Sequence, residues 1–243
     1  MNAPVAVVTG GARGLGEAIV RRLHADGYRI AIADVHPAPD LVSELDGTGA
    51  TVREFAVDVR ERTELERLRD AVVAEFGDVQ VLVNNAARTQ AKPLFEITPE
   101  ELDDVLAVNV GGTFAACQVF GEYLAGRGYG RIVNMASLAG QNGGTTTGGH
   151  YAASKGAIIT VTKVFARELA ARGVTVNAVS PGPQDSPAVR EIVGDTEALA
   201  AAIPVGRLGD PGFVARMVAL LASPEAASVT GACWDANGGL YLR

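Results

Sequence analysis

The stretch that decides the fold is residues 5–16, Val5-Ala6-Val7-Val8-Thr9-Gly10-Gly11-Ala12-Arg13-Gly14-Leu15-Gly16. Its first four residues form a continuous apolar run, which is typical of a parallel strand buried on both faces. Glycines follow at once, and apolar residues such as Ile19 and Leu23 then recur with a helical period. We therefore predict a strand over 4–9, a glycine turn, and a helix that ends near Gly27.

The glycine turn has the chemistry of a dinucleotide-binding site. Glycine has no Cβ, so the backbone can approach a pyrophosphate closely. The N-terminus of the following helix offers unpaired N–H groups and the positive end of the helix dipole to the same anion. A cluster of glycines by itself is often only a turn, but a strand before it and a helix after it favour dinucleotide binding.

A second predicted strand, 29–33, ends on Asp34, about 20 residues beyond the glycine turn. A carboxylate at that place can accept hydrogen bonds from the adenosine ribose hydroxyls and would repel a 2′-phosphate, which favours NAD over NADP. Arg13 opposes this reading, because a cation inside the turn could meet a 2′-phosphate. A loop arginine can swing into solvent, whereas the carboxylate opposes the phosphate directly, so we expect NAD. An ordinary polar strand end would give the same sequence.

Apolar runs and amphipathic segments alternate along the rest of the chain. Further strands are expected at 51–57, 79–83, 130–135, 174–179 and 229–234, and further helices at 61–76, 98–109, 111–124, 151–173 and 210–222, with a polar loop at 140–149. This alternation implies right-handed crossovers and an α/β fold with a doubly wound parallel sheet and helices on both faces. Ligands in such sheets bind outside the carboxyl ends of the strands.

The composition of the chain limits the classes of function that it can have. The 243 residues are 48% hydrophobic, which is enough for a real core. The net charge of −7 argues against a nucleic-acid or anionic-membrane surface, because either would need a basic patch. No signal-like segment precedes the first strand, so we expect a cytoplasmic protein. Cys117 and Cys233 lie far apart without metal-ligand spacing, so reduced thiols and no metal site are expected.

Tyr151 and Lys155 stand four residues apart at the start of a predicted long helix, and therefore on one face. A phenol is a poor base at neutral pH, but a nearby cation favours its ionised form, so Lys155 is expected to lower the pKa of Tyr151. Alone, such a pair is most often a half-exposed helix face. Two further polar residues accompany it: Ser137 just past the fifth predicted strand, and Asn109 inside a helix, where asparagine is unfavourable.

Taken in order, these motifs resemble the short-chain dehydrogenase/reductase family in its compact single-domain form. The resemblance covers essentially all 243 residues. It rests on the motifs Thr9 to Gly16, Asp58-Val59, Asn84-Asn85-Ala86, Asn109, Ser137, Tyr151 with Lys155, and Asn177 through Pro181-Gly182. It implies a Rossmann fold and a single domain over 1–243.

The resemblance also implies a catalytic tetrad of Asn109, Ser137, Tyr151 and Lys155. Tyr151 would act as general base or acid, Ser137 would bind the substrate oxygen, Lys155 would hold the nicotinamide ribose, and Asn109 would anchor a water. The implied cofactor-binding residues are Gly10, Arg13, Gly14, Leu15, Gly16, Asp34, Asp58, Val59, Asn85, Ala86, Tyr151, Lys155, Pro181, Gly182 and Ser186. Ser186 stands where the family often has threonine, and it keeps the hydroxyl expected to contact the nicotinamide amide.

These features predict an NAD-dependent oxidoreductase that interconverts a secondary alcohol and a ketone by hydride transfer. Substrate choice is expected from 90–95, 140–150 and 183–208, the last of which we expect to form a lid. These segments hold few aromatic or cationic side chains, which favours a small, largely uncharged substrate. His150 is either a pocket residue or a helix-start residue.

Two other readings remain open. An NADPH-dependent ketoreductase of the 3-oxoacyl carrier reductase type would be supported by Arg13 and opposed by Asp34. A non-enzymatic nucleotide sensor on the same fold would generally lose the catalytic tyrosine or lysine, and this chain keeps both.

Small residues around Gly111 and Gly156 permit close helix packing, and the family resemblance implies a homotetramer.

Overall fold

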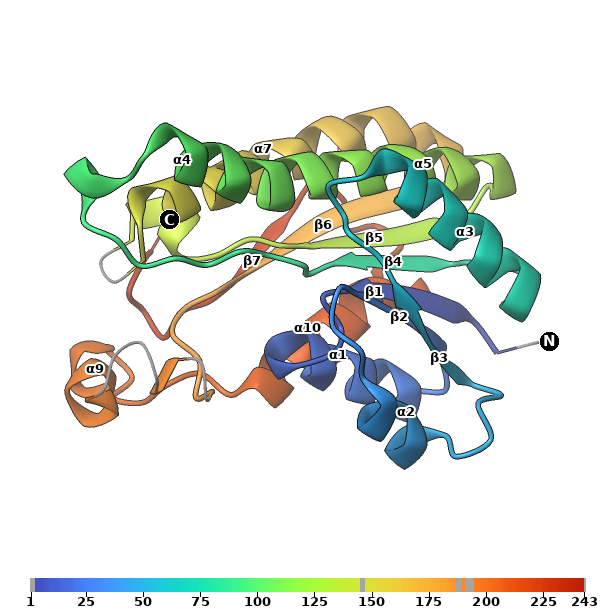
Figure 1. Cartoon of the computed structure of the whole chain (residues 1–243), viewed down its shortest axis with the longest axis horizontal. Helices are drawn as coiled ribbons and strands as arrows, with labels where there is room; N and C mark the ends of the chain where they lie inside the picture. The colour runs from blue at the N-terminus through green and yellow to red at the C-terminus, as the bar shows by residue number, and fades with distance from the viewer. Residues whose placement is uncertain (1–2, 145–146, 187–188, 191–194, 243) are drawn as a thin grey trace.

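The computed structural model describes residues 3–144, 147–186, 189–190 and 195–242. These residues build a seven-stranded sheet in the order β3-β2-β1-β4-β5-β6-β7, in which every neighbouring pair is parallel (Figure 1). The strands are β1 Val5–Thr9, β2 Arg29–Asp34, β3 Val52–Ala56, β4 Val81–Asn84, β5 Gly130–Met135, β6 Val174–Pro181 and β7 Cys233–Ala236. The expected doubly wound parallel sheet is confirmed.

Helices cover both faces of the sheet, each over its own apolar core. One face carries α1 Gly14–Ala25, α2 Pro39–Leu45 and α10 Pro211–Ala222. The other carries α3 Arg62–Phe76, α4 Pro99–Leu106, α5 Thr113–Arg127 and α7 Gly149–Leu169, while the short α6 Ala139–Asn142 and α9 Thr196–Ala202 lie near the carboxyl ends of the strands. The central strands β1, β4 and β5 are buried along their whole length, which explains the apolar runs of β1 and β4.

The strand order reverses between β1 and β4, and this reversal positions the site. Thr9 at the end of β1 is level with both Ala33 of β2 and Asn84 of β4. The turns that follow these strands therefore leave the sheet at one edge. Ligands of open α/β sheets bind in the crevice at such a reversal.

Three elements differ from the sequence expectation. Ala139–Asn142 forms α6, although a loop was expected there. The segment around Asn109 is a π-helix, Ala107–Gly112, between α4 and α5. The last strand begins at Cys233 instead of near 229, because the preceding segment is held to β6 by other bonds: Gly231 has φ +74°, and the Asn177 side chain bonds Val229 O and Ala232 N.

The stretch Pro99–Arg127, which runs from α4 through α5, is long and apolar enough to cross a membrane by length and composition alone. Half of its apolar window is buried inside the molecule. Phe120 and Leu124 of α5 are fully buried in the core beneath the sheet. The stretch is therefore a core helix of this fold.

Candidate active site

The glycine turn brings two loops into close contact and leaves open space in front of α1. A Cβ on Gly10, which has φ +63°, would lie 2.7 Å from Cα of Ala86, and a Cβ on Gly16 would overlap the carbonyl oxygen of Gly10. Gly14 has φ +59°, and a Cβ there would meet nothing within 4 Å. No side chain caps α1 at Arg13, so its first N–H groups stay free for an anion. This cradle fits the pyrophosphate of a dinucleotide.

Asn85 ties the turn after β4 to the glycine turn. Its Nδ2 donates to the carbonyl oxygens of Thr9 and Gly10, at 3.2 and 2.8 Å. The backbone N–H groups of Asn85 and Ala86 donate to Oγ1 of Thr9, at 3.1 and 3.2 Å. The two loops on either side of the strand-order reversal thus form one rigid surface.

Asp34 lies at the end of β2 beside the glycine turn, with both carboxylate oxygens held by backbone. Oδ2 accepts from the N–H of Ala12 at 3.0 Å, and Oδ1 accepts from the N–H of His36 at 2.9 Å. Arg13 is exposed and forms no ion pair within the described part of the chain. The carboxylate is therefore fixed, whereas the arginine is free to move.

Asp58 and Val59 follow β3 at the same edge. The Arg60 guanidinium, with Nη2 2.6 Å from Oδ2 of Asp58, holds the pKa of that carboxyl below its usual range. Val59 is buried against Gly112, where a Cβ would lie 2.6 Å from its Cγ2. The carboxylate therefore stays ionised near neutral pH, and Val59 forms part of the wall.

Lys155 of α7 is buried, and its Nζ donates to the carbonyl oxygen of Met135 at 2.6 Å. Burial lowers the pKa of this ammonium to about 8. Nζ also lies 5.7 Å from the ring centroid of Tyr151, one helical turn earlier. The helix therefore brings the amine and the phenol into one enclosed place, as the four-residue spacing indicated.

Burial raises the pKa of Tyr151, while hydrogen bonds from the hydroxyls of Ser137 and Thr89 oppose that rise. The expectation that Lys155 lowers this pKa is therefore wrong for the structure described here. The groups that oppose the rise are two hydroxyls, and the ammonium is bonded to Met135. Sequence reasoning missed Thr89, for which the only signal was its position in the turn after β4.

Asn109 is buried in the π-helix and bonds three groups, none of them a side chain of Tyr151 or Lys155. Its Nδ2 donates to Oγ of Ser154 at 2.9 Å and to the carbonyl oxygen of Arg88 at 3.1 Å, and its Oδ1 accepts from the N–H of Arg88 at 2.7 Å. Ser154 in turn donates to the carbonyl oxygen of Tyr151 at 2.7 Å. Asn109 thus braces the turn of α7 that carries the phenol, and π-helical turns often occur at functional sites.

Ser137 follows β5, and its Oγ accepts from the N–H of Ala139 at the start of α6 at 3.2 Å. Helix α6 packs directly on α7, because a Cβ on Gly140 would lie 2.6 Å from the backbone N of Gly156. This contact between two glycines holds Ser137 opposite Tyr151.

The implied residues after β6 are brought to the same edge, but a part of that segment lies outside the described residues. Pro181 ends β6, and the N–H of Gly182 donates to the carbonyl oxygen of Ala236 at 2.9 Å. The hydroxyl of Ser186 accepts from the N–H of Val189 at 3.3 Å. In the expected lid, 183–208, residues 187, 188 and 191–194 are among those not described, and α9 is its regular element.

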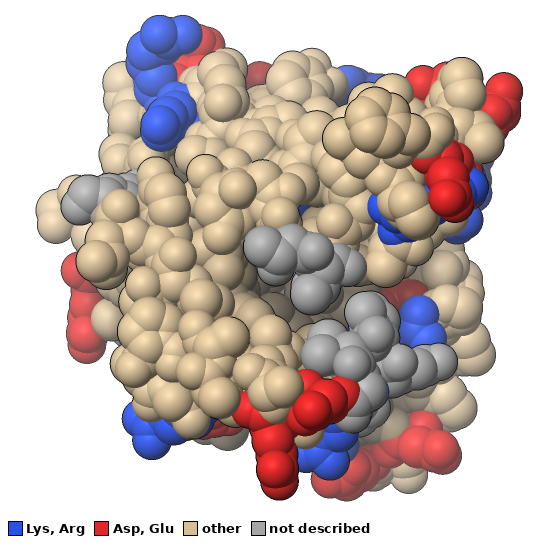
Figure 2. Space-filling view, turned by 90° about the vertical axis from the view of Figure 1, so that its left-hand side faces the viewer, with Lys and Arg blue, Asp and Glu red and all other residues tan. Residues whose placement is uncertain are grey.

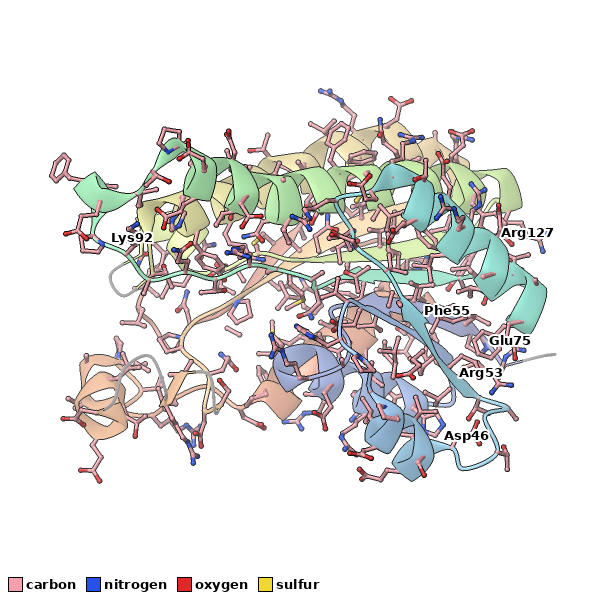
Figure 3. All side chains as sticks on the ribbon, viewed as in Figure 1. Asp46, Arg53, Phe55, Glu75, Lys92 and Arg127 are labelled. Atoms are coloured by element: carbon pink, nitrogen blue, oxygen red, sulfur yellow. The ribbon has the colours of Figure 1, made fainter. Side chains whose placement is uncertain are left out.

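Charged side chains on the substrate side of the edge include a pair in the segment after β6, where Arg190 lies 2.7 Å from Asp185. Figure 2 shows a hollow on this face, with uncharged side chains along its left-hand side and acidic and basic residues along its right-hand and lower sides. Figure 3 shows Lys92 at this end, where it pairs with Glu101 at 2.7 Å and fixes the loop after β4. His150 is buried at the start of α7, and neither of its ring nitrogens has a partner among the described residues.

The described residues contain no group of three or more histidine, cysteine or acidic side chains placed to hold a metal ion. Cys117 is a free thiol buried in the core, and burial raises its pKa to about 12.

Comparison with known proteins identifies the family of this chain. A family model described as enoyl-(acyl carrier protein) reductase matches residues 10–241. A 3-oxoacyl-(acyl-carrier-protein) reductase of Vibrio cholerae is 36% identical over 243 residues, covering 100% of this chain and 99% of the relative. An acetoacetyl-CoA reductase of Rhizobium meliloti is 37% identical, with 98% of each chain covered, and a D-threitol dehydrogenase of Mycolicibacterium smegmatis is 37% identical, covering 100% and 95%. The chain belongs to the short-chain dehydrogenase/reductase family, whose oxidoreductases use nicotinamide cofactors.

Proposed function

We propose that this protein is an NAD-dependent oxidoreductase that interconverts a secondary alcohol and a ketone by hydride transfer. The observation that carries the choice of cofactor is the fixed carboxylate of Asp34, held by Ala12 and His36 beside the glycine turn. A negative charge there can accept hydrogen bonds from ribose hydroxyls, and it would repel the 2′-phosphate of NADP. The bound nicotinamide would supply the hydride acceptor or donor.

Tyr151 is the proton donor and acceptor of the proposed reaction. In oxidation its phenolate takes the alcohol proton, and in reduction its phenol returns a proton to the new alkoxide. Ser137 donates a hydrogen bond to the substrate oxygen, where charge develops as the carbinol becomes a carbonyl. Both hydroxyls already lie within one hydrogen-bonded group, which is the arrangement this role requires.

In this proposal Lys155 holds the ribose of the nicotinamide, and its Nζ lies 5.7 Å from the ring centroid of Tyr151. Because its pKa is about 8, it is largely protonated at neutral pH. Asn109 fixes the turn of α7 through Ser154, and in this proposal its position also anchors a water on the proton path from Lys155. The residues after β6, Gly182 and Ser186, meet the carboxamide end of the cofactor.

The substrate is a small, largely uncharged alcohol or ketone, taken up in the cytoplasm. The uncharged surface along the left-hand side of the hollow in Figure 2 supports this class. A D-threitol dehydrogenase among the relatives acts, by its name, on a compact polyol. We propose a homotetramer as the working form.

A panel of secondary alcohols with oxidised cofactor, and of the matching ketones with reduced cofactor, tests the reaction. Turnover is followed by the near-ultraviolet absorbance of reduced nicotinamide. We expect measurable oxidation of at least one small secondary alcohol and reduction of its ketone. Binding of the cofactor, measured by calorimetry, without turnover of any member would contradict the small-substrate reading.

A second candidate is an NADPH-dependent ketoreductase of the 3-oxoacyl carrier reductase type. The guanidinium of Arg13 within the glycine turn favours it, since it is exposed, has no ion-pair partner among the described residues and could meet a 2′-phosphate. Two relatives are named as reductases of acyl-carrier or acyl-CoA substrates. Reduction of a 3-oxoacyl thioester with NADPH, and no oxidation of small alcohols with NAD, would favour this candidate over the first.

A further inference from the structure

A second cavity lies at the edge of the sheet opposite the glycine turn. Its volume is about 410 Å³, and it lies between the starts of β5 and β6 and the segment that joins α10 to β7. Figure 3 shows Arg127, which immediately precedes this region in sequence, at the end of the molecule opposite Lys92. The cavity is therefore separate from the proposed hydride-transfer site.

Arg131, in β5, lines this cavity with a guanidinium that is buried but incompletely bonded. The residue is only 3% exposed. Its Nε and Nη1 donate to the carbonyl oxygens of Ser223 and Gly130, at 3.1 and 2.9 Å, while its Nη2 donates to no described residue and is not fully enclosed. No carboxylate in the described ranges pairs with it, and the ring of Tyr129 lies 4.4 Å from the guanidinium carbon. Buried cations are normally paired, so the open side of this guanidinium is a place where an anion could bind.

Two threonines beside Arg131 also have hydroxyl groups that can form further hydrogen bonds. Thr175 is 7% exposed, and its Oγ1 has no partner among the described residues. Oγ1 of Thr230 accepts from the N–H of Val176 at 3.1 Å, and its own O–H donates to no described group. A buried hydroxyl without a partner costs free energy, so such groups mark places where a bond is completed by something else.

The rest of the cavity wall suits the apolar part of a small organic molecule. Ala170, Pro224 and Ala227 present apolar surface, and no acidic side chain lines the cavity. A volume of about 410 Å³ falls within the range of small-molecule sites. The protein as a whole carries a net charge of −7, so this lining, with one cation and no acid, is of opposite sign to the molecule.

We propose that this cavity binds a small organic anion, whose carboxylate or phosphate group is held by Arg131, Thr175 and Thr230. The apolar body of the anion would pack on Tyr129 and the alanines. The proposal does not depend on the function assigned to the opposite edge.

Calorimetric titration of the full-length protein, first without NAD and then with NAD present, tests the proposal. The probes are benzoate, phenyl phosphate and neutral benzamide, and the first two distinguish the kind of head group. We expect at least one anion to bind with a Kd of about 1 mM or tighter, and benzamide to bind at least about tenfold more weakly. No binding of either anion, equal binding of benzamide, or loss of binding when NAD is added would overturn it.

Variants locate the site. Arg131→Met keeps much of the apolar stem and removes the charge, so anion affinity should fall at least about tenfold. Arg172→Met is the matched control, because Arg172 is an exposed arginine that pairs with Glu122 and does not line the cavity. Equal losses in both variants, or none in Arg131→Met, would overturn the assignment.

Thr175→Val keeps the test decisive if Arg131→Met does not fold. Valine has the shape of threonine and leaves no unpartnered hydroxyl, so this variant should unfold at the same temperature as the wild type or higher. Anion affinity should nevertheless fall about threefold or more, because one donor to the head group is lost. Unchanged affinity in folded Thr175→Val would contradict the site.

Discussion

Tyr151 owes its proposed role to its surroundings more than to its own chemistry. Burial raises its pKa, so below that value the residue is a phenol that can give a proton to a ketone. Ser137 and Thr89 bond its hydroxyl, and Asn109 fixes its helical turn through Ser154. At the scale of single residues, the site is therefore a set of hydroxyls held in place by backbone and amide contacts.

Tyr151→Phe should nearly abolish turnover while leaving the fold intact. General acid–base catalysis typically contributes about 10²–10⁴-fold to the rate. Phenylalanine keeps the ring of residue 151 and removes the hydroxyl that gives or takes the proton. Steady-state rates with the best substrate of the panel measure the loss, and circular dichroism with a melting curve checks the fold. Thr89→Val is the comparison variant, and a smaller loss of turnover is expected because Thr89 only forms a hydrogen bond with the phenol. Appreciable activity in a folded Tyr151→Phe protein would sink the assignment.

The pH dependence follows from the same environment. The base needed for oxidation is the phenolate, whose share grows as the pH rises toward the raised pKa of Tyr151. Alcohol oxidation should therefore increase through the alkaline range, and ketone reduction, which needs the phenol, should be fastest near or below neutral pH. Rates in both directions from about pH 6 to about pH 10 test this. Oxidation that falls above neutral pH would contradict it.

At the scale of elements, glycines set how closely the parts of the site approach. Gly16 leaves no room for a Cβ beside Gly10, and Gly140 packs α6 directly on α7. The first contact closes the glycine turn and the second joins two helices, and both lie at the carboxyl edge of the sheet. The path of the backbone at this edge therefore depends on a few residues without side chains.

Gly16→Ala should destabilise the protein and weaken cofactor binding together, because its Cβ would overlap the carbonyl oxygen of Gly10. Gly126→Ala is the matched control: this exposed glycine lies inside α5, and a Cβ there meets nothing within 4 Å. The control should gain about 0.4–1 kcal/mol of unfolding free energy. Chemical denaturation and cofactor titration measure both variants. Wild-type cofactor affinity in Gly16→Ala would show that the turn does not approach the ligand as argued.

The sequence predicts those elements whose signals are local. Alternating apolar runs and amphipathic segments gave the strands and the main helices, including α3 with its left-handed Gly77 cap. The errors arise where distant contacts decide: α6 forms against Gly156, and the start of β7 is delayed by bonds to Asn177.

The same limit applies to the candidate site. The order of the strands brings Asp34, Ser137 and the Tyr151 helix to one edge of the sheet. The βαβ pattern of the sequence predicts this placement. The bond from Lys155 to the carbonyl of Met135, and the contact of Thr89 with the phenol, could not be foreseen. They depend on where a backbone carbonyl and a loop hydroxyl lie in space, and residue types do not encode this.

At the scale of the whole molecule, apolar side chains remain exposed on two separate sets of helices. Phe114 of α5 and Val164 of α7 are 40% and 43% exposed, and on the opposite layer Phe213 and Leu220 of α10 are 50% and 44% exposed. Two apolar faces on opposite layers suit two kinds of two-fold interface, as a tetramer with three two-fold axes requires.

Light scattering at micromolar concentration should therefore give a mass of about 100 kDa, four times the 25.1 kDa of the chain. Phe114→Glu, which places a charge in one proposed interface, should reduce the mass to that of a dimer, while Glu122→Gln on the exposed side of α5 should not. A monomer mass for the wild-type protein would contradict the assembly.

The most direct test of the account is the ratio of kcat/KM for NAD to that for NADP, measured in the wild type and in Asp34→Asn. Asparagine keeps an acceptor oxygen for the backbone and removes the charge. We predict that the wild type prefers NAD by at least about tenfold, which corresponds to about 1.4 kcal/mol, and that the preference shrinks or reverses in the variant. A wild-type preference for NADP, unchanged by the substitution, would contradict the account and assign the cofactor choice to Arg13.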